Sequence, residues 1–450
     1  MNAVAGATGG ARNLQVDFFR GLALVVIFIN HMPGNPLTAY TPSRLGPSDA
    51  AEIFVFLSGY AAAIAYGRSF TRAGVGLGST AVLFRCAQIY VAHLALFLSV
   101  AALYAFAMAL GVSEFDGQFE GLRFFFDRPQ EALPALLGLR YVPNFFDILP
   151  MYLVTMLWLP LVWMLSRIHV LLALVFPGAL YVVAGICGWE LSADPLTGRS
   201  WFFNPFFWQL LFFTGFALGS GWIAVPRWRR AFGIVCGIFL LLCYPLDNEF
   251  GYSHLPWYAA LREAWAPALD KTHLGVIRYA HFLALAYVVG HVTAMHRAWM
   301  KTAIARWFIA LGQQSLPVFM LGTVLSFAGG ILLVGDDSSL SDGASITIAG
   351  VLLMVGFARL LSWIENKPWK GVVVRRPPTL ILRAAGRGAM AFTLVLLASA
   401  PLYFLQTNSG ESPVEFDALQ ADVQLSDDDP PALTPAEYQP TDDEPNVDTL

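Results

Sequence analysis

Residues 146–189 read FDILPMYLVTMLWLPLVWMLSRIHVLLALVFPGALYVVAGICGW. This stretch holds two long apolar runs, and Arg167 and His169 lie between them. A helix of about 20 residues crosses a hydrocarbon core of about 30 Å, because each helical residue adds 1.5 Å. The stretch therefore predicts two consecutive transmembrane helices, over 146–166 and 169–189.

Similar long apolar runs recur along the chain of 450 residues, of which 57% are hydrophobic and only 13% are charged. A soluble domain carries about 25% charged residues, so a soluble fold is excluded. The composition predicts an all-α, polytopic transmembrane helical bundle of about 10–11 spans. The other expected spans are 16–32, 48–67, 80–110, 204–223, 229–246, 275–295, 304–334, 343–363 and 387–406.

The distribution of Lys and Arg predicts the orientation of the bundle. A cytoplasmic N-terminus places Arg68, Arg72, the cluster at 227–230 and the basic stretch 367–387 on the cytoplasmic side, as the positive-inside rule requires. We therefore expect a multi-pass protein whose N-terminus is cytoplasmic. The first apolar run contains charged residues and leads into a polar segment, so no cleavable signal peptide is expected.

Three regions follow from these patterns: a cytoplasmic segment 1–15, a transmembrane domain 16–406 and a tail 407–450. The tail has no Lys or Arg and many Asp and Glu, and this composition predicts disorder. Ten spans would leave the tail in the cytoplasm, and eleven would place it outside. The cysteines Cys86, Cys187, Cys236 and Cys243 show no metal-binding spacing and are interpreted as small packing residues.

Polar residues are concentrated around the first expected span. Asp17 and Arg20 lie one helical turn apart, and Asn30, His31 and Asn35 lie where the apolar run ends. Ionisable groups are costly inside a bilayer and usually mark a functional site or a pathway. The structural alternatives are an ion pair between Asp17 and Arg20 and an ordinary interfacial position for His31.

The next segment contains Asp49, Glu52, Ser58 and Tyr60. Asp49 and Glu52 fall in the first turn of an expected helix, where the helix dipole favours acidic side chains. These two residues could act only in starting the helix, and Ser58 with the glycine after it could only allow close helix packing.

A second polar cluster, at the start of the span 275–295, contains Lys271, His273, Arg278 and His281. These side chains are candidates for binding an anion or a polar acceptor, or they form a positively charged helix entrance. Arg85 lies at the cytoplasmic end of the span 80–110. It is either a phosphate-binding residue or one more residue of the positive-inside pattern.

A neutral histidine beside a carboxylate is a good general base. The chain has no Gly-x-Ser-x-Gly nucleophile motif, no phosphate-binding glycine loop, no metal-ligand spacing and no nucleic-acid signature. Direct transfer of a group to a bound hydroxyl is therefore favoured over a covalent serine intermediate.

Two blocks resemble the OpgC protein family: Asp17-Phe-Phe-Arg20-Gly-Leu-Ala with Asn30-His31-Met-Pro-Gly-Asn35, and Asp49-Ala-Ala-Glu52-Ile-Phe-Val-Phe-Leu-Ser58-Gly-Tyr60. Weaker matches are Arg85 to Tyr90, Phe203 to Phe213 and Lys271 to Tyr287, and together they cover about residues 12–365. OpgC proteins succinylate osmoregulated periplasmic glucans at the bacterial inner membrane and resemble the wider acyltransferase-3 superfamily.

The resemblance implies a membrane O-acyltransferase that uses succinyl-CoA as a co-substrate, binds no permanent cofactor and acts on a periplasmic glucan. It implies His31 as the base, with Asp17 or Glu52 as its orienting acid, and Arg85 near coenzyme A. The wider superfamily often shows several arginines at this last position, whereas this chain has one. Membrane lipids would be its other partners.

Two alternatives remain open from the sequence. An acetyl-specific polysaccharide O-acyltransferase would differ only in its donor. A transporter or flippase would use Asp17, Arg20, His31 and Glu52 as a pathway through the membrane.

Overall fold

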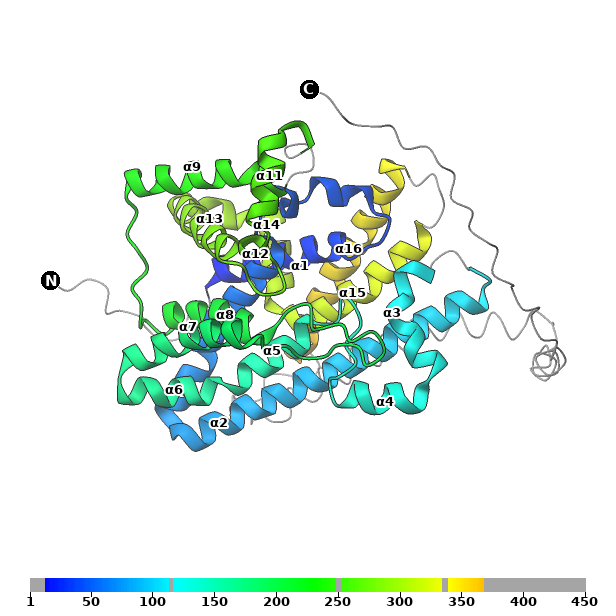
Figure 1. Cartoon of the computed structure of the whole chain (residues 1–450), viewed down its shortest axis with the longest axis horizontal. Coiled ribbons are helices and arrows are strands. Elements are labelled where there is room, and N and C mark those ends of the chain that lie inside the picture. The colour runs from blue at the N-terminus through cyan, green and yellow to red at the C-terminus, as the bar shows by residue number, and fades with distance from the viewer. Residues whose placement is uncertain (1–12, 113–115, 248–252, 334–338, 368–450) are drawn as a thin grey trace, which may run out of the picture. The chain divides into compact units, whose positions relative to one another are not determined.

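The computed structural model describes residues 13–112, 116–247, 253–333 and 339–367 (Figure 1). The expected span 387–406, the expected acidic tail and most of the expected N-terminal segment lie outside these residues. All described residues belong to one of the two units of the chain, Met1–Ala398.

The described chain is helical, and its only strand-like pairing is an isolated bridge between Ser192 and Ser200. The helices are α1 (Leu14–Asn30), η1 (Pro36–Tyr40), η2 (Pro42–Arg44), α2 (Ala50–Ala109), α3 (Asp116–Asp127), α4 (Pro129–Leu137), α5 (Ile148–Leu157), α6 (Leu159–Ile168), α7 (Val170–Cys187), α8 (Pro205–Gly219), α9 (Arg230–Asp247), α11 (Pro256–Ala264), α12 (Ala266–Leu269), α13 (Val276–Met295), η3 (Arg297–Lys301), α14 (Ala303–Gln313), α15 (Ser315–Leu332) and α16 (Leu340–Glu365).

Six described helical segments are long and apolar enough to cross a membrane. They are α2, the α5–α6 pair, α7, α13, α15 and α16. Large apolar side chains such as Leu171, Ile186 and Leu241 are exposed on the outside of these and neighbouring helices. Lipid is the solvent that such side chains require. The all-α, polytopic membrane fold is therefore confirmed, and the total of 10–11 spans stays a prediction.

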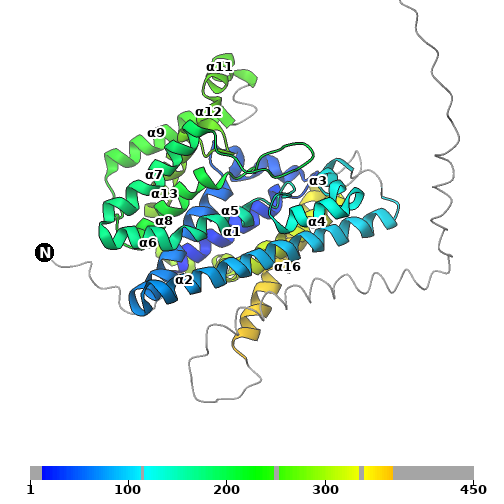
Figure 2. The ribbon, with the colours of Figure 1, turned by 60° about the horizontal axis from the view of Figure 1, so that its bottom comes forward.

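Helix α2 contains two of the expected spans, 48–67 and 80–110. Its backbone leaves helical geometry at Gly74, where φ is 78° and ψ is 177°. A Cβ on Gly78 would lie 2.3 Å from the Phe70 ring, although eight residues of straight helix would separate these positions by about 12 Å. The chain thus bends sharply at Gly74, and the second half of α2 runs as a long helix (Figure 2).

Two other expected spans are each broken into a pair of helices. The span 304–334 is divided at Gln314, whose amide donates to Glu365 (2.9 Å) and to Ser362 (3.4 Å) on α16. The span 146–166 is divided at Trp158, and Pro160 lies in the first turn of the helix that follows. These bonds and the proline account for breaks that hydropathy does not reveal.

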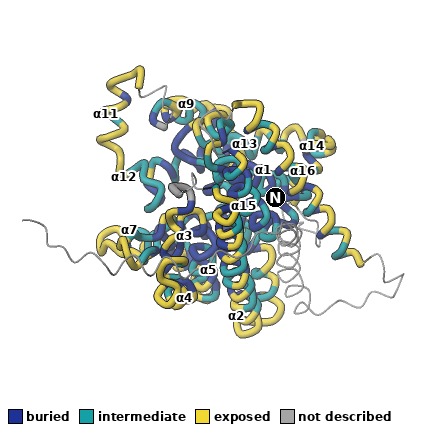
Figure 3. The backbone as a smooth tube through the Cα atoms, turned by 90° about the vertical axis from the view of Figure 1, so that its right-hand side faces the viewer, coloured by how far each residue is buried: buried dark blue, intermediate teal, exposed yellow. Residues whose placement is uncertain are grey.

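Close packing through glycine holds the centre of the bundle together. A Cβ on Gly21 of α1 would lie 1.9 Å from the Phe308 carbonyl oxygen of α14, and one on Gly59 of α2 would lie 1.9 Å from the Phe212 carbonyl oxygen of α8. Only glycine allows backbones to approach this closely. Buried segments of α1 lie inside, whereas α11 is largely exposed (Figure 3).

The four cysteines are unpaired. Three of them, Cys86, Cys236 and Cys243, are buried, which agrees with a packing role. Cys187 is exposed at the last residue of α7, so its interpretation as a packing residue is wrong.

Candidate functional site

His31 lies in the turn directly after α1. Its backbone N–H donates to the Ile27 carbonyl (2.9 Å), so the end of the helix fixes its position. Its ring centroid lies 4.8 Å from that of Phe145, whose backbone has a φ of 73°. A non-glycine residue at positive φ is strained, and such strain is concentrated at functional sites. The Nδ1 atom of His31 is buried and has no hydrogen-bond partner among the described residues.

Asp49 and Glu52 start helix α2 with a capping box. The Asp49 carboxylate accepts from the Ala51 N–H (2.8 Å), and the Glu52 carboxylate accepts from the Asp49 N–H (2.7 Å). Asp49 also forms an ion pair with Lys271. The expected helix-start role of both acids is confirmed, but Asp49 has this second partner as well.

Glu52 is fully buried and pairs with the nearly buried Arg278 of α13, at 2.8 Å between Oε1 and Nη1. Arg278 also donates from Nε to the Leu269 carbonyl (3.3 Å). A charge buried at this depth is tolerated only when it is paired and hydrogen-bonded. The pair joins two segments that are 226 residues apart in the chain.

We call His31, Asp49, Glu52, Lys271 and Arg278 the His31 cluster. Burial, together with the positive charge of Lys271, lowers the pKa of His31 to about 4, although Asp49 acts in the opposite direction. Burial alone would raise the pKa of Asp49, but Lys271 and Arg278 hold it below its ordinary value. At neutral pH the cluster therefore combines a neutral imidazole with the ion pair of Asp49 and Lys271.

His281 lies beside this cluster on α13. Its Nδ1 forms a hydrogen bond with the Ser48 hydroxyl (2.7 Å). A side chain at Gly46, where φ is 152°, would clash with the His281 ring, because its Cβ would lie 2.5 Å from Nε2. The histidine thus fixes the segment that leads into α2.

His273 has the carboxylate partner that was expected for His31. Its Nδ1 pairs with Asp270, and its Nε2 lies 3.3 Å from Glu190. Asp270 also accepts from the Thr272 N–H (3.0 Å) and the His273 N–H (3.1 Å), so the loop is fixed around its side chain. This imidazole is held in one orientation between two acids.

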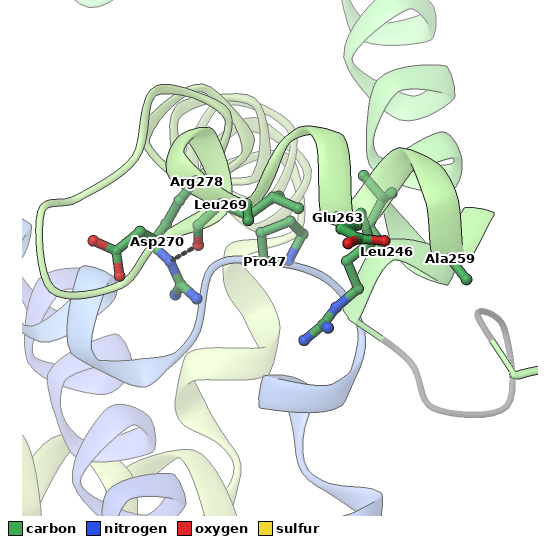
Figure 4. A pocket seen from close by; sticks show the side chains of 9 residues that line it. Pro47, Leu246, Ala259, Glu263, Leu269, Asp270 and Arg278 are labelled. Atoms are coloured by element: carbon green, nitrogen blue, oxygen red, sulfur yellow. Dashed lines mark hydrogen bonds between the residues drawn. The ribbon is translucent and has the colours of Figure 1, made fainter. Parts of the chain in front are cut away.

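A cavity of about 600 Å³ lies beside Arg278 (Figure 4). Pro47, Leu269 and Asp270 line it, and Arg262 and Glu263 supply charges from α11. Its size is within the range of small-molecule sites. The loop 270–275 therefore reaches this cavity through Asp270 and Glu190 through His273.

The structure does not bring Asp17 to His31. Fourteen residues of helix separate them, or about 21 Å along the axis. Asp17 is buried against α14, where it accepts from the Gln313 amide at 3.5 Å. Arg20, one turn later, donates to the Ser315 hydroxyl of α15. Asp17 therefore cannot be the acid that orients His31.

Glu52 does not orient His31 either: its hydrogen bonds are to Arg278 and the Asp49 N–H, and His31 Nδ1 has no partner among the described residues. No carboxylate in the described part of the chain forms a hydrogen bond with His31. Asp49 acts on this imidazole through its charge only. The expected hydrogen-bonded pair of His31 and a carboxylate is therefore absent from the described residues. The charges of Asp49 and Lys271 act on His31 instead.

The two asparagines near His31 have structural partners. Asn30 donates to the Ser43 hydroxyl (2.7 Å) and accepts from the Thr41 hydroxyl (2.9 Å). Asn35 is buried and donates to the Thr347 hydroxyl of α16 (3.0 Å). Both side chains hold the segment between α1 and α2 in place.

Three further candidates lie away from the His31 cluster. Ser58 and Tyr60 lie deeper in α2, where the adjoining Gly59 packs on α8, so close helix contact explains this motif. Arg85 lies in the second half of α2, beyond the Gly74 bend, and donates to Gln88 at 3.1 Å. It has no contact with the cluster in the described residues.

Asp147 was missed from the sequence although it is nearly fully buried just before α5. Its Oδ1 accepts from the Phe202 N–H (3.0 Å) and lies 3.7 Å from Arg199, and its Oδ2 has no hydrogen-bond partner among the described residues. The Phe202 ring lies 5.7 Å from the Lys271 ammonium. The sequence signal for Asp147 is an acid at the start of an apolar run. Its contacts could not be predicted, because they involve the loop that contains Arg199 and Phe202 and the loop that contains Lys271.

The comparison with known families is decisive. The family model described as OpgC protein matches residues 12–366. The chain belongs to the OpgC family. No curated protein and no solved structure matches it.

At family level, this membership supports a transferase of the OpgC type in a multi-pass membrane protein. The matched region contains all members of the His31 cluster. A neutral imidazole can remove a proton from a hydroxyl, and a paired ammonium can stabilise negative charge that develops nearby. The arrangement in this OpgC chain therefore suits group transfer to a hydroxyl.

Proposed function

We propose that the chain is an O-acyltransferase of the bacterial inner membrane that moves a succinyl group from succinyl-CoA to hydroxyls of a periplasmic glucan. The family match carries this proposal. The His31 cluster supports it, because a neutral imidazole at the end of a buried helix lies within the electrostatic range of the Lys271 ammonium, which is paired with Asp49.

In the proposed reaction, His31 takes the proton of the acceptor hydroxyl. The hydroxyl oxygen then attacks the thioester carbonyl, the new C–O bond forms and the C–S bond breaks. The coenzyme A thiolate leaves and receives the proton from His31. The product is a succinyl ester, and no covalent enzyme intermediate is required.

Lys271 is the residue that we assign to the negative charge of this reaction. Its side chain is 27% exposed, and an ammonium has three donors, so it can bind a second anion while it is paired with Asp49. Asn30 is less suitable as an oxyanion donor, because its hydrogen bonds with Ser43 and Thr41 fix its amide within the segment between α1 and α2. Tyr60 is less suitable because it lies deeper in α2. Arg278, at the cavity of about 600 Å³, is our assignment for the succinyl carboxylate.

The proposal is tested with purified full-length protein in detergent, incubated with an unmodified periplasmic glucan and either succinyl-CoA or acetyl-CoA. We expect release of free coenzyme A and a succinyl mass increment on the glucan only with succinyl-CoA. Transfer from acetyl-CoA alone would establish the acetyl-specific alternative. In a parallel assay on protein reconstituted into liposomes, glucan transport without thioester turnover would establish the transporter.

His273→Ala is the matched comparison for His31→Ala, because His273 has the geometry of an oriented base. Loss of a general base lowers turnover by at least about a hundredfold. We expect this loss in His31→Ala and a much smaller one in His273→Ala. The reverse order would transfer the role of base to His273 and contradict our assignment.

A further inference from the structure

A second hollow, of about 550 Å³, lies just beyond the end of α7. It is lined by Gly188, Trp189, Glu190 and Phe206, and we call it the Trp189 hollow. Gly188 closes α7 in the left-handed conformation with a φ of 60°, and no atom lies within 4 Å of the position that its Cβ would occupy. The hollow is therefore open above the backbone.

Trp189 is held in position although its ring is not buried. Its backbone N–H donates to the Ala184 carbonyl (3.1 Å), and its backbone carbonyl accepts from the Asn204 side-chain amide (2.8 Å). The indole packs against Phe206, with 5.4 Å between ring centroids and an angle of 61° between the planes. It nevertheless remains 41% exposed. The result is a rigid aromatic platform at the surface.

The carboxylate of Glu190 forms the polar edge of this platform. Glu190 lies 3.3 Å from His273 Nε2 and accepts from the Ser200 hydroxyl. His273 in turn pairs with Asp270. In the same loop, the backbone carbonyl of Thr272 accepts from the backbone N–H of Asn204 (3.2 Å). Because Lys271 belongs to this same loop, the Trp189 hollow lies next to the His31 cluster.

We infer that the Trp189 hollow is a subsite for one sugar residue of the acceptor, an inference that rests on the proposed function. An aromatic face covers the C–H face of a pyranose ring, and a carboxylate accepts hydrogen bonds from its hydroxyls. Glu190, which lines the hollow, would repel a phosphate or another anion, and its charge also opposes a lipid chain. A neutral sugar can both stack on the Trp189 indole and donate hydrogen bonds to the Glu190 carboxylate.

The experiment measures binding of unmodified periplasmic glucan to the full-length protein in detergent by calorimetry, with no acyl donor present. The variants are Trp189→Ala, Trp189→Leu, Trp189→Phe and Trp363→Ala. Trp363 is the matched control, because it is 55% exposed in the last turn of α16 and lines neither hollow. It therefore reports what loss of an ordinary interfacial tryptophan does.

We expect Trp189→Ala to weaken glucan binding by about tenfold and to raise the KM for glucan to a similar extent, with the KM for succinyl-CoA unchanged. Trp189→Phe keeps an aromatic face and should bind glucan within about threefold of the wild type. Trp363→Ala should match the wild type.

Equal glucan binding by the wild type and Trp189→Ala would overturn the subsite. Trp189→Leu, which keeps an apolar side chain of similar bulk but removes the aromatic face, carries the test if the alanine variant does not fold, and glucan binding by Trp189→Leu equal to that of the wild type would likewise overturn the subsite. If the wild type transfers succinyl groups but Trp189 has no effect, the subsite fails and the proposed function stands. If the wild type binds glucan through Trp189 but transfers no acyl group, the proposed function fails and the subsite stands.

Discussion

At the residue scale, the chemistry depends on how charges are paired around one neutral imidazole. Lys271 is the cation that acts on His31, and it is already paired with Asp49, the N-cap of α2; Arg278 is paired in turn with Glu52 in the first turn. Each cation of the cluster thus has an acid as partner, and the buried His31 Nδ1 has no hydrogen-bond partner among the described residues. Ion pairing allows these charged side chains to be buried in a lipid-embedded fold. It also leaves the His31 imidazole available to accept a proton.

The pH dependence of turnover tests this arrangement. A general base acts in its neutral form, and the pKa of His31 is lowered to about 4. We expect kcat/KM to remain level as the pH falls from 7 to about 5 and to decrease only near pH 4, not near the ordinary histidine value of about 6.5.

The variant Lys271→Met should shift the pKa of His31, and with it the pH dependence of kcat/KM. It removes the cation that lowers the pKa of His31 and leaves Asp49, which raises it. The acid limb of the kcat/KM profile should therefore move to higher pH. A limb near pH 6.5 in the wild type would contradict the lowered pKa of His31, and a limb that does not move in Lys271→Met would show that Lys271 does not act on the base.

Asp147, which precedes α5, offers a second test at this scale. Burial raises the pKa of Asp147 to about 6 although Arg199 opposes the shift. An acid whose pKa is raised by folding binds its proton more tightly in the folded state. Its contribution to stability is thus fully present below about pH 4 and is lost as the pH rises through about 6.

Asp147→Asn removes this titration and keeps an acceptor for the Phe202 N–H. The stability of the wild type relative to the variant should fall by up to about 3 kcal/mol between pH 4 and pH 7.5, as measured by thermal unfolding in detergent. A difference that stays constant over this range would mean that Asp147 has its ordinary pKa.

At the element scale, glycine contacts decide how closely the helices pack. The α2–α8 contact uses Gly59, Gly215 and Gly219, and each of their Cβ positions would lie within 3 Å of an atom of the facing helix. This contact fixes the start of α2, and with it Asp49 and Glu52, against the rest of the bundle. The Ser58-Gly59 motif is therefore explained by packing.

Gly59→Ala should force α2 and α8 apart and destabilise the fold by about 1–3 kcal/mol, as overpacking does. The matched control is Gly237→Ala on α9, where no atom lies within 4 Å of the Cβ position. Alanine in an open helical position should stabilise the helix by up to about 1 kcal/mol. Thermal unfolding in detergent measures both, and equal effects would contradict the role of the α2–α8 contact.

At the scale of the whole molecule, orientation in the membrane decides which substrate reaches which end of the bundle. The His31 cluster, the Trp189 hollow and the loop around Arg199 are connected by the contacts described above. The Gly74 bend lies at the other end of the first half of α2, next to Arg68 and Arg72. We predict that the cluster faces the periplasm and the bend faces the cytoplasm.

Single cysteines in a Cys187→Ser background test this orientation, since the three other cysteines are buried. Thr197→Cys is exposed near Arg199, and Thr71→Cys is exposed near the Gly74 bend. A membrane-impermeant maleimide should label only Thr197→Cys in cells whose outer membrane has been permeabilised, and both variants after lysis. Labelling of only Thr71→Cys in these cells would show the opposite orientation.

The sequence determined by itself where the described membrane helices lie. In lipid, a backbone must satisfy its own hydrogen bonds, so a long apolar run is a helix whatever its neighbours are. The boundaries of α1, α7, α8, α13 and α16 accordingly fall within a few residues of the expected spans. His31 was also accessible to sequence reasoning, because a histidine at the end of an apolar run stands out.

Only the tertiary structure decided which groups meet. The pairs Glu52–Arg278 and Asp49–Lys271 join residues 226 and 222 positions apart, and Asp17 is separated from His31 by the length of α1. Phe145, Asp147 and Glu190 reach their partners through loops whose course depends on contacts between helices. Hydropathy acts along the chain and sets each helix, whereas ion pairing acts through space and depends on how those helices pack.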